Sequence, residues 1–477
     1  MPTIADLLMD PRVKSTVAAI GDALRAALPD GKFGDREAQA LAISNEAVRE
    51  FLREELQEIA DSLGEEVLVN GEPYRLHEPG TDAYHSLCGP LPVSRGSYRK
   101  VGVRNGPIVI ALELAAGLVE GATPALGYSI AHGYAQHDMR AHLQTLQAAH
   151  RVAPSRTTLE RIAKAIAIET VGQAVRIEKI LRRAEKVPAD AKAISIGLDR
   201  TSVPMVEDRP AGAPPKPEPK RRKPRERSAP EPYDIKWRMA YVGTVSFVDE
   251  NGEALSTRRY AAADCDDPRE LVEQMVADVR AALRRRPLLH VGIVQDGAPE
   301  MWNLTREGLQ TLCDKGQLKE WFEAIDRYHL MERLGGALKM VDPDATDQER
   351  KRQLNSWSEL LDMTDLAIDV IESFFIKRYD LAGEHRGLLW EHLRYIRNNK
   401  DRMRYVTMRN ANLPVGSGVT ESAAKTVVGH RAKGAGQRWR QDGLRGVVTL
   451  RAIMQSQRLP NFWTHLASGY TAEVDAA

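Results

Sequence analysis

Three acidic side chains stand where the chain would hold them rigidly and still open them to solvent. Asp199 directly follows the apolar run AISIGL and Asp296 follows LLHVGIVQ, and each run predicts a buried strand. Glu421 lies within PVGSGVTESAAKT, in what the pattern predicts to be the first turn of a helix. In open α/β sheets ligands bind at the carboxyl ends of the strands, so these positions point to a binding or catalytic site.

Either aspartate taken alone has a plainer explanation. An Asp at a strand end often only caps the next helix, and Asp296, which precedes Ala298-Pro299-Glu300, is placed for that role. Glu421 favours a functional interpretation over a helix cap, because two aspartates and one glutamate form a hard, all-oxygen ligand set that suits Mg²⁺ or Mn²⁺. Two such ions about 3.5–4 Å apart assist both the attack on a phosphodiester and the departure of its leaving oxygen. The donor set therefore favours metal-dependent phosphodiester chemistry.

Hydrophobic periodicity predicts the elements that precede these residues. Residues 1–106 show apolar positions at helical spacing and then short runs broken by Gly and Pro, which predicts a helical region with a small β segment. Residues 107–188 predict helices. Two of them, around a turn at Ala153-Pro154, fit a DNA-binding helix-turn-helix or the commoner case of two packed helices in a bundle.

The remaining segment, 189–465, predicts an α/β domain built from strands at 193–198, 237–248, 254–260 and 288–294 and an amphipathic helix at 267–285. Residues 206–236 interrupt it, because eight prolines alternate there with the basic run KRRKPRER. Such a composition cannot bury enough apolar surface to fold and predicts a disordered basic loop, which either touches DNA phosphates or is a solvated linker. A helical insertion at about 330–410 is expected between Asp296 and Glu421.

Four motifs give the chain a recognisable pattern: GLDRTSVPM (197–205), VQDGAPEMW (294–302), IDRYHLMERL (325–334) and GSGVTESAAKTVVGHRAKGAGQRW (416–439). Together they resemble the DDE transposases of bacterial insertion sequences, closest to the ISKra group, over roughly 190–465. The resemblance implies a ribonuclease-H-like catalytic domain with Asp199, Asp296 and Glu421 as the catalytic, metal-binding triad. It also implies two Mg²⁺ or Mn²⁺ ions per site, double-stranded DNA (element ends and target) as partner, and a homodimer that pairs two ends.

The family pattern also contains an Asp-x-x-His element, matched here by Asp326 and His329. From its own surroundings His329 is a half-buried histidine on an amphipathic helix, whereas the resemblance implies a catalytic role in steadying scissile DNA or a flanking base. Members of the group often have a cysteine-bearing, zinc-ribbon-like segment upstream, but the corresponding stretch, 96–106, has no cysteine. The chain's three cysteines are far apart, so we expect no zinc site.

Basic residues cluster just after the glutamate. The segment Lys425–Arg451 has seven Lys and Arg against one acidic residue, in a chain whose formal net charge is only +1. Because phosphates drive affinity through counterion release, this excess predicts a DNA-binding surface, although charge runs are often only solvated faces. The expected phosphate contacts are Lys425, Arg431, Lys433, Arg438 and Arg440. Trp439 either stacks on an exposed base or fills the core, and the core is favoured.

Composition bounds the remaining possibilities. With 477 residues, 43% of them hydrophobic, the chain can bury large cores. Its longest apolar stretch, near 108–119, is broken by Glu113 and too short to cross a bilayer, so we expect no membrane association and a cytoplasmic protein that joins the nucleoid when bound to DNA. The sequence thus predicts a transposase that cuts DNA and transfers strands. A silent, transposase-derived DNA-binding protein and a nuclease or resolvase of the same fold stay open as alternatives.

Overall fold

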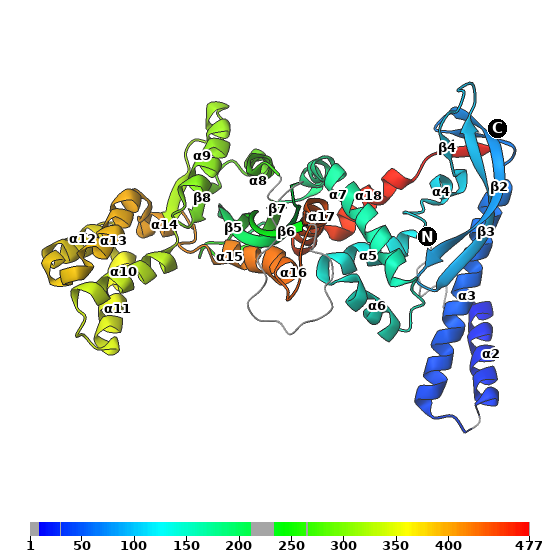
Figure 1. The fold of residues 1–477 in the computed structure, drawn as a ribbon, viewed down its shortest axis with the longest axis horizontal. Coiled ribbons are helices and arrows are strands. Elements are labelled where there is room, and N and C mark those ends of the chain that lie inside the picture. Colours follow the sequence, from blue (N-terminus) through cyan, green and yellow to red (C-terminus); the bar gives the residue numbers. More distant parts are fainter. Residues whose placement is uncertain (1–8, 29, 211–232, 264–265, 477) are drawn as a thin grey trace. The chain divides into compact units, whose positions relative to one another are not determined.

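The computed structural model of the chain describes residues 9–28, 30–210, 233–263 and 266–476 (Figure 1). They pack into two compact units. The first runs up to Glu169 and also includes the chain from Trp463 onward, and the second is Thr170–Phe462. Both units contain helices and a sheet, which confirms the mixed α/β class. The segment boundaries predicted near residues 106 and 188 stay a prediction.

The first unit combines an antiparallel sheet with helices. Its strands are β1 (Glu66–Val69), β2 (Glu72–Ser86), β3 (Gly89–Lys100), β4 (Ile108–Val109) and β10 (Val474–Ala476), in the order β10-β1-β2-β3-β4. Its helices are α2 (Pro11–Ala27), α3 (Phe33–Ser62), α4 (Ala111–Ala116), α5 (Pro124–Gln136), α6 (Met139–Ala148) and the first part of α7 (Arg156–Ala184). The chain therefore begins with helices, which are followed by the strands of this sheet.

Local hydrogen bonds explain where the two candidate helix-turn-helix elements begin. Asp138 caps α6, because its Oδ1 accepts from the backbone N–H of Ala141 at 2.9 Å. Ser155 precedes α7, and its Oγ accepts from the N–H of Thr158 at 3.2 Å. Such side-chain acceptors satisfy amide groups that the first turn of a helix leaves unpaired. The two helices are confirmed, and a contact between them and DNA stays a prediction.

The sheet of the second unit holds the two aspartates. Its strands are β5 (Ala193–Asp208), β6 (Tyr233–Val248), β7 (Ala254–Ala262), β8 (His290–Gln295) and β9 (Phe322–Ile325), in the order β7-β6-β5-β8-β9. The β7-β6-β5 strands are antiparallel neighbours, whereas β5, β8 and β9 run parallel. Parallel pairing needs crossover connections, which α8 (Pro268–Arg285) and α9 (Pro299–Asp314) provide.

The two faces of this sheet differ in what covers them. Alternate residues of β5 and β8 on one face, such as Ile196 and Ile293, are buried in one core cluster with Met275 of α8 and Trp302 of α9. Val294, which points to the other face, belongs to a second cluster with the helices that follow β9. The chemistry-bearing residues lie on this second face, as described below.

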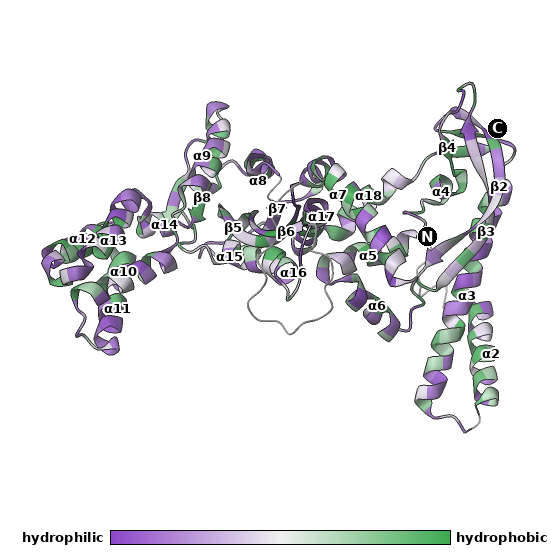
Figure 2. Cartoon of the chain, viewed as in Figure 1, coloured by the Kyte–Doolittle hydropathy of each residue, from purple (hydrophilic) through white to green (hydrophobic). Residues whose placement is uncertain are grey.

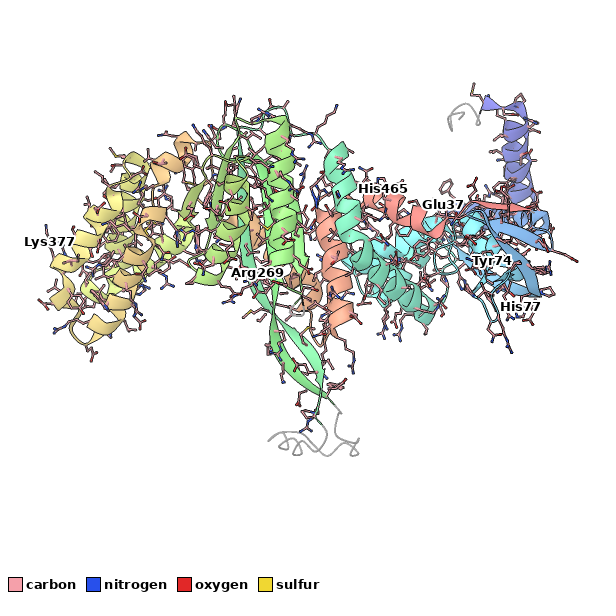
Figure 3. All side chains as sticks on the ribbon, turned by 90° about the horizontal axis from the view of Figure 1, so that it is seen from above. Glu37, Tyr74, His77, Arg269, Lys377 and His465 are labelled. Carbon is pink, nitrogen blue, oxygen red and sulfur yellow. The ribbon has the colours of Figure 1, made fainter. Side chains whose placement is uncertain are left out.

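The strands β5 and β6 extend well beyond the rest of the sheet, and Figure 3 shows their outer halves projecting as a two-stranded arm. They pair along their whole length, from Ala193 with Val248 to Asp208 with Tyr233. The loop predicted for 206–236 is therefore wrong at both ends, because backbone pairing continues through 206–208 and 233–236 despite the polar, proline-rich composition. Most of the predicted loop, including KRRKPRER, lies outside the described residues, as does Cys265.

A set of helices lies between β9 and the glutamate, in the segment where the sequence predicts a helical insertion. They are α10 (Arg327–Val341), α11 (Asp347–Met363), α12 (Ala367–Lys377), α13 (Arg386–Asn399) and α14 (Tyr405–Asn410), with the 3-10 turns η1 (Tyr379–His385) and η2 (Lys400–Arg402). Figure 2 shows hydrophobic and hydrophilic positions along each of the long ones, as amphipathic helices require. Their core includes Trp357, whose ring lies 5.2 Å from the rings of Phe374 and Phe375.

Short helical pieces complete the second unit. They are α15 (Gly418–Ala423), the π-helical turn η3 (Ala424–Gly429), α16 (His430–Ala432), α17 (Gln441–Gln455) and the first half of α18 (Leu459–Ala467). The rest of α18 and η4 (Ser468–Tyr470) belong to the first unit. The inner residues of α15, η3 and α17 pack on β5 and β6 of the arm through Val203, Met205 and Ala240. Within the described residues, no helix is long and apolar enough to span a membrane.

Candidate active site

Asp199 and Asp296 occupy equivalent positions on neighbouring strands. The parallel ladder pairs Ile196 of β5 with Ile293 of β8, three residues before each aspartate. Side chains alternate along a strand, so residues at matching positions point to the same face. The two carboxylates therefore lie side by side, with Asp296 directly after the end of β8 and Asp199 within β5, just beyond the point where its pairing with β8 ends. The sequence predicted a strand that ends before Asp199, which is wrong, because β5 continues to Asp208 in its pairing with β6.

A buried glutamine holds the two strands together at this point. Gln295 is 1% exposed, and its Oε1 accepts from the backbone N–H of Leu198 at 3.2 Å. Its Nε2 donates to Thr305 Oγ1 on α9 at 3.3 Å. The backbone ladder between β5 and β8 ends two residues earlier, so this side chain bridges the strands where their backbones separate. It fixes the position of each aspartate, because Asp199 and Asp296 directly follow the bridged residues.

Asp296 does not cap a helix, so the plainer explanation of this residue is wrong. Helix α9 begins only at Pro299, its N-cap is Ala298, and no side chain makes the capping hydrogen bond. The Oδ1 of Asp296 instead accepts from its neighbour Gly297 N–H at 2.5 Å, and the residue is exposed. Its backbone carbonyl accepts from Trp302 Nε1 at 2.8 Å, which anchors the turn while the carboxylate faces outward.

Asp326 is the buried residue that joins His329 to the segment of the glutamate. It is 1% exposed and caps α10, since its Oδ1 accepts from the N–H groups of Tyr328 at 2.6 Å and His329 at 3.1 Å. Its Oδ2 accepts from both the N–H and, at 2.6 Å, the hydroxyl of Ser417. A buried carboxylate with four donors is fully satisfied, so it fixes two segments of the chain against each other.

Glu421 reaches the site from the first turn of α15, as predicted. Its Oε1 lies 3.3 Å from the Nε2 of His329 and accepts from the Ser417 hydroxyl at 3.3 Å. Both Glu421 and His329 are about one-third exposed, at 30% and 33%, so they remain open to a ligand. The sequence prediction that His329 belongs with the carboxylates therefore agrees with its position.

Gly197 lets α15 approach the sheet closely. A Cβ atom at this glycine would lie 2.2 Å from Thr420 Oγ1 and 2.9 Å from the carbonyl oxygen of Val294, which no real side chain tolerates. The buried hydroxyls of Thr420 and Thr244 lie 2.7 Å apart and form a hydrogen bond across the same contact. Glu421 follows Thr420 directly, so this contact places it beside β5, the strand that contains Asp199.

The electrostatics of the site show that its charged groups influence one another. Burial raises the pKa of Asp199, and the negative charges of Glu421 and Asp296 raise it further, against a backbone hydrogen bond and the field of His329. Burial lowers the pKa of His329, but this effect is outweighed by Asp296 and other nearby carboxylates, which leave that pKa above its usual value. Three carboxylates that repel one another form a site suited to a cation.

The side chains do not form a ready-made metal cage. Within the described part of the chain, no three His, Cys, Asp or Glu residues are grouped as metal ligands. Asp199 Oδ1 accepts from the Arg200 N–H at 2.7 Å, and Glu421 is turned toward His329. The donor set nevertheless fits a divalent cation, because it is all-oxygen and because a cation would relieve the repulsion that raises the pKa of Asp199.

Three residues of the site were missed from the sequence. Asp326 was noted only as part of a motif, and Ser417 was not singled out, although it lies within the GSGVTES motif. Nothing in the sequence pattern distinguishes Tyr395 of α13 from other residues of an amphipathic helix. Its hydroxyl is buried without a hydrogen-bond partner in the described residues, and a Cβ on Gly297 would lie 2.5 Å from its ring. Burial, together with the charge of Asp296, raises the pKa of Tyr395 to about 12.

The five residues predicted to contact phosphates differ in their exposure to solvent. Arg431 is only 6% exposed and lies over the Trp439 ring, 4.9 Å from its centre, so it has little surface to offer a phosphate. The others are exposed and hydrogen-bonded or ion-paired at their tips: Lys425 with Glu421, Lys433 with Thr201, Arg438 with Tyr233 and Arg440 with Asp208. Trp439 is half-buried, and its Nε1 donates to the carbonyl of Ala432 at 3.1 Å, which supports its assignment to the core.

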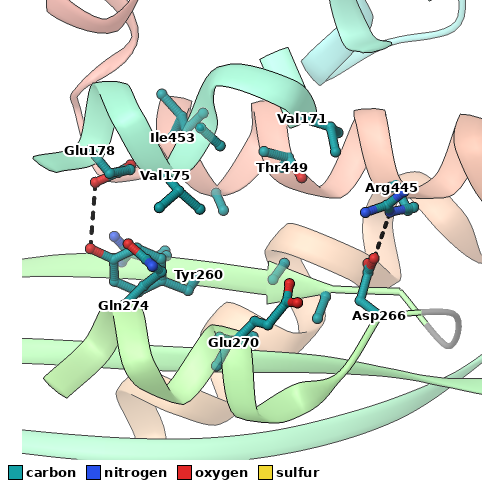
Figure 4. Close-up of a pocket in the computed structure, with 16 residues that line it drawn as sticks. Val171, Val175, Glu178, Tyr260, Asp266, Glu270, Gln274, Arg445, Thr449 and Ile453 are labelled. Atoms are coloured by element: carbon teal, nitrogen blue, oxygen red, sulfur yellow. Dashed lines mark hydrogen bonds and ion pairs between the residues drawn. The ribbon is translucent and has the colours of Figure 1, made fainter. Parts of the chain in front are cut away.

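Two cavities lie near the sheet. One, of about 520 Å³, adjoins the α15 segment on the face of the carboxylates and is lined by hydroxyl-bearing residues such as Ser195, Thr244 and Ser417. The other, of about 130 Å³, lies between α7, β7, α8 and α17, where Figure 4 shows Glu178 beside Tyr260 and Arg445 paired with Asp266. None of the predicted catalytic residues lines the second cavity.

A comparison with protein-family models finds no match to this chain, and a comparison with curated proteins finds no relative.

Proposed function

We propose that this protein is a DDE transposase with a ribonuclease-H-like catalytic domain, which cuts DNA and transfers the resulting ends. The observation on which this proposal depends is the convergence of Asp199, Asp296 and Glu421, with His329, on one face of one sheet. These residues come from segments separated by 97 and 125 positions. A purely structural origin is a poor explanation, because carboxylates that repel one another do not stabilise a fold.

The topology supports the same class. The order β7-β6-β5-β8-β9 joins three antiparallel strands to two parallel ones, with helices crossing between the parallel strands. This is the arrangement expected of the ribonuclease-H-like fold, with Asp199 within one central strand and Asp296 directly after the other. Fold alone does not define an activity, so the assignment depends on the residues of the site and on the motifs around them.

The roles of the side chains follow from their positions. Asp199 and Asp296 would hold Mg²⁺ or Mn²⁺ between the two strands, and Glu421 would complete the ligand set from α15. When bound, such ions lower the pKa of a coordinated water or hydroxyl and stabilise the leaving oxygen of a phosphodiester. His329 contacts Glu421 at 3.3 Å and is placed to orient this carboxylate or to contact a phosphate. Asp326 and Ser417 position both His329 and Glu421 through their hydrogen bonds.

The partner we propose is double-stranded DNA, as element ends and target, bound by a homodimer in the cytoplasm at the nucleoid. Lys425 lies one helical turn after Glu421, 3.7 Å from its Oε2, and Lys433 donates to Thr201 on the strand that bears Asp199. Phosphates bound by these cations would be close to the carboxylates. We leave Arg431 out of the proposed contacts because it is buried.

The decisive experiment compares the wild type with Asp296→Asn on duplex DNA that includes the ends flanking the gene. We expect the variant to bind these ends as the wild type does and to show no Mg²⁺-dependent cleavage, because one metal ligand is lost while the surface is unchanged. Asp314→Asn is the matched control, since it makes the same chemical change at the other, exposed end of α9. Cleavage by Asp296→Asn at the wild-type rate would refute the proposal.

The products distinguish the remaining classes. Strand transfer, seen as joined products in Mg²⁺, supports a transposase. Hydrolysis without joining indicates a nuclease or resolvase, and specific end binding without any nicking in Mn²⁺ indicates a silent DNA-binding protein.

A further inference from the structure

A strongly basic groove lies between two helices of the second unit. It has a volume of about 370 Å³ and is formed by α7, from Lys179 onward, and by α8. Small residues, Ala277 and Ala281, form part of its lining. The other lining residues are all cationic: Lys179, Arg182, Arg183, Arg280, Arg284 and Arg285. No acidic and no aromatic residue lines the groove.

Two of the six cations have a structural role. Arg182 is buried, and its Nε lies 3.4 Å from the carboxylate of Asp278. Arg285 donates through Nη2 to the carbonyl oxygens of Arg182 and Arg183, at 3.0 and 2.8 Å. These carbonyls lie in the last turn of α7, where a helix leaves its acceptors unpaired. Arg182 and Arg285 therefore hold the two helices together.

The other four cations have no such explanation. Lys179, Arg183 and Arg284 are exposed, Arg280 is half-buried, and in the described residues none of the four forms an ion pair. Lys179 and Arg183 are four residues apart on α7, as are Arg280 and Arg284 on α8. Like charges at this spacing destabilise a helix.

The helix dipole accounts for only part of this arrangement. Basic residues are favoured in the last turn of a helix, which applies to Arg183 and Arg284, near the ends of α7 and α8. The effect falls off within that turn. Lys179 and Arg280 each lie five residues before the last residue of their helix, so their presence in the groove is unexplained by the dipole.

We propose that this groove binds the phosphodiester backbone of double-stranded DNA. Residues four apart on a helix are separated by about 6 Å along its axis, so each helix presents two cations in a row to a strand of phosphates. The lack of aromatic side chains argues against unpaired bases, which bind by stacking. Contacts to phosphates carry no sequence information directly, so we expect binding that does not depend on sequence.

The groove is separate from the proposed active site. Helix α8 packs with Met275 on the sheet face that contains Ile196 and Ile293, whereas Asp199 and Asp296 point to the other face. A duplex in the groove is therefore a different segment from the phosphodiester at the carboxylates. The choice of DNA as the ligand rests on the proposed function. The inference that the groove binds an anion does not, because it follows from the cationic lining alone.

The test measures duplex binding as a function of salt, with EDTA present so that cleavage plays no part. Arg280→Gln/Arg284→Gln removes two cations and keeps the helix intact. Each lost phosphate contact should reduce the slope of log Kobs against log[NaCl] by about 0.9, so we expect a slope shallower by about 1.8 and, at 0.15 M salt, about 30-fold weaker binding of a 30-base-pair duplex of any sequence. Lys179→Gln/Arg183→Gln should give the same change from the other helix.

The control is Lys377→Gln/Arg394→Gln, which removes two exposed cations from the helical insertion, where Figure 3 labels Lys377. An unchanged slope in both groove variants overturns the proposal, as does an equal change in the control. Tripolyphosphate is tested in the same way, and weaker binding of it with unchanged DNA binding shows an anion site that is not for nucleic acid. Because no metal is present, failure here is distinct from failure of Asp296→Asn to abolish cleavage.

Discussion

Replacing Asp326 by Asn is the sharpest test of how the active site is positioned. The carboxylate of Asp326 accepts four hydrogen bonds, two from α10 and two from Ser417, and so joins His329 to the segment of Glu421. The substitution is nearly isosteric. Its amide keeps one oxygen acceptor for α10, but it offers an NH₂ group to Ser417, so the backbone N–H of Ser417 loses its acceptor, whereas the Ser417 hydroxyl can turn to accept.

The structure gives the size of the effect. One hydrogen bond to a charged acceptor is lost at a site that is 1% exposed, and such a bond is worth about 1.5–3 kcal/mol, so the free energy of unfolding should fall by about that amount. The start of α15 would also move away from Asp326, and Glu421 with it. A displacement of about 1 Å at a reacting centre can cost about 100-fold in rate, so we expect a cleavage rate reduced by about that factor.

The assay must separate positioning from simple loss of stability. Asp365→Asn is the matched control, because Asp365 also accepts from backbone amides, those of Val406 and Thr407, at the start of a helix outside the site. Urea unfolding and single-turnover DNA cleavage are measured for both variants at a temperature where both are folded. We expect both to lose stability and only Asp326→Asn to lose most of its cleavage rate, with DNA binding retained.

One result would refute this reasoning. If Asp326→Asn were destabilised and still cleaved DNA at the wild-type rate, the link between Asp326 and Ser417 would be structural only, and the position of Glu421 would not depend on it.

Two further predictions concern the sheet and the core behind it. Gly197→Ala should lower stability by about 1–3 kcal/mol and reduce cleavage, because the new methyl group meets Thr420 Oγ1 at 2.2 Å; Gly172→Ala, with open space around it, is the control for both measurements. Burial raises the pKa of Glu178 to about 7, with Arg458 opposing the shift, so the folded state binds this proton more tightly and wild-type stability falls as pH rises from about 4.5 through 7. Urea unfolding measures the free energy of unfolding of Glu178→Gln and of the wild type. We expect the difference between them to shift in favour of the variant by up to about 3 kcal/mol from pH 5 to pH 8. If the two free energies changed with pH in parallel, the prediction would be contradicted.

The elements of the second unit were largely predictable from the sequence because their hydrophobic patterns are strong. Buried strands at Ala193–Leu198 and His290–Val294 and the amphipathic helix α8 appear close to the expected positions. The arm was underestimated, since residues 206–208 and 233–236 look like a loop by composition. They form strands because residues 206–208 pair with residues 233–235. A prediction from a short stretch of sequence cannot detect pairing between segments so far apart.

In the candidate site, too, some residues could be predicted from the sequence and others could not. Asp199 and Asp296 could be predicted because each directly follows an apolar run, and the ladder then fixes them relative to each other. The offset between the strands, 293 − 196 = 97, equals the offset between the aspartates, 296 − 199 = 97. The intervening arm, β7 and α8 do not alter that register, so the length of chain between the two residues has no bearing on their distance in space.

Glu421 is different, because no strand register brings it to the site. It depends on a buried carboxylate, a serine and a glycine, namely Asp326, Ser417 and Gly197, which are distant in sequence and individually unremarkable in pattern. Asp326 has to be buried and charged, which is unfavourable unless every acceptor is used. A hydrophobic replacement of similar size would stabilise the core as well, but it could not fix the backbone N–H of Ser417 and the first turn of α10 at once. The charge at position 326 is therefore best explained by the precision that the neighbouring Glu421 and His329 require.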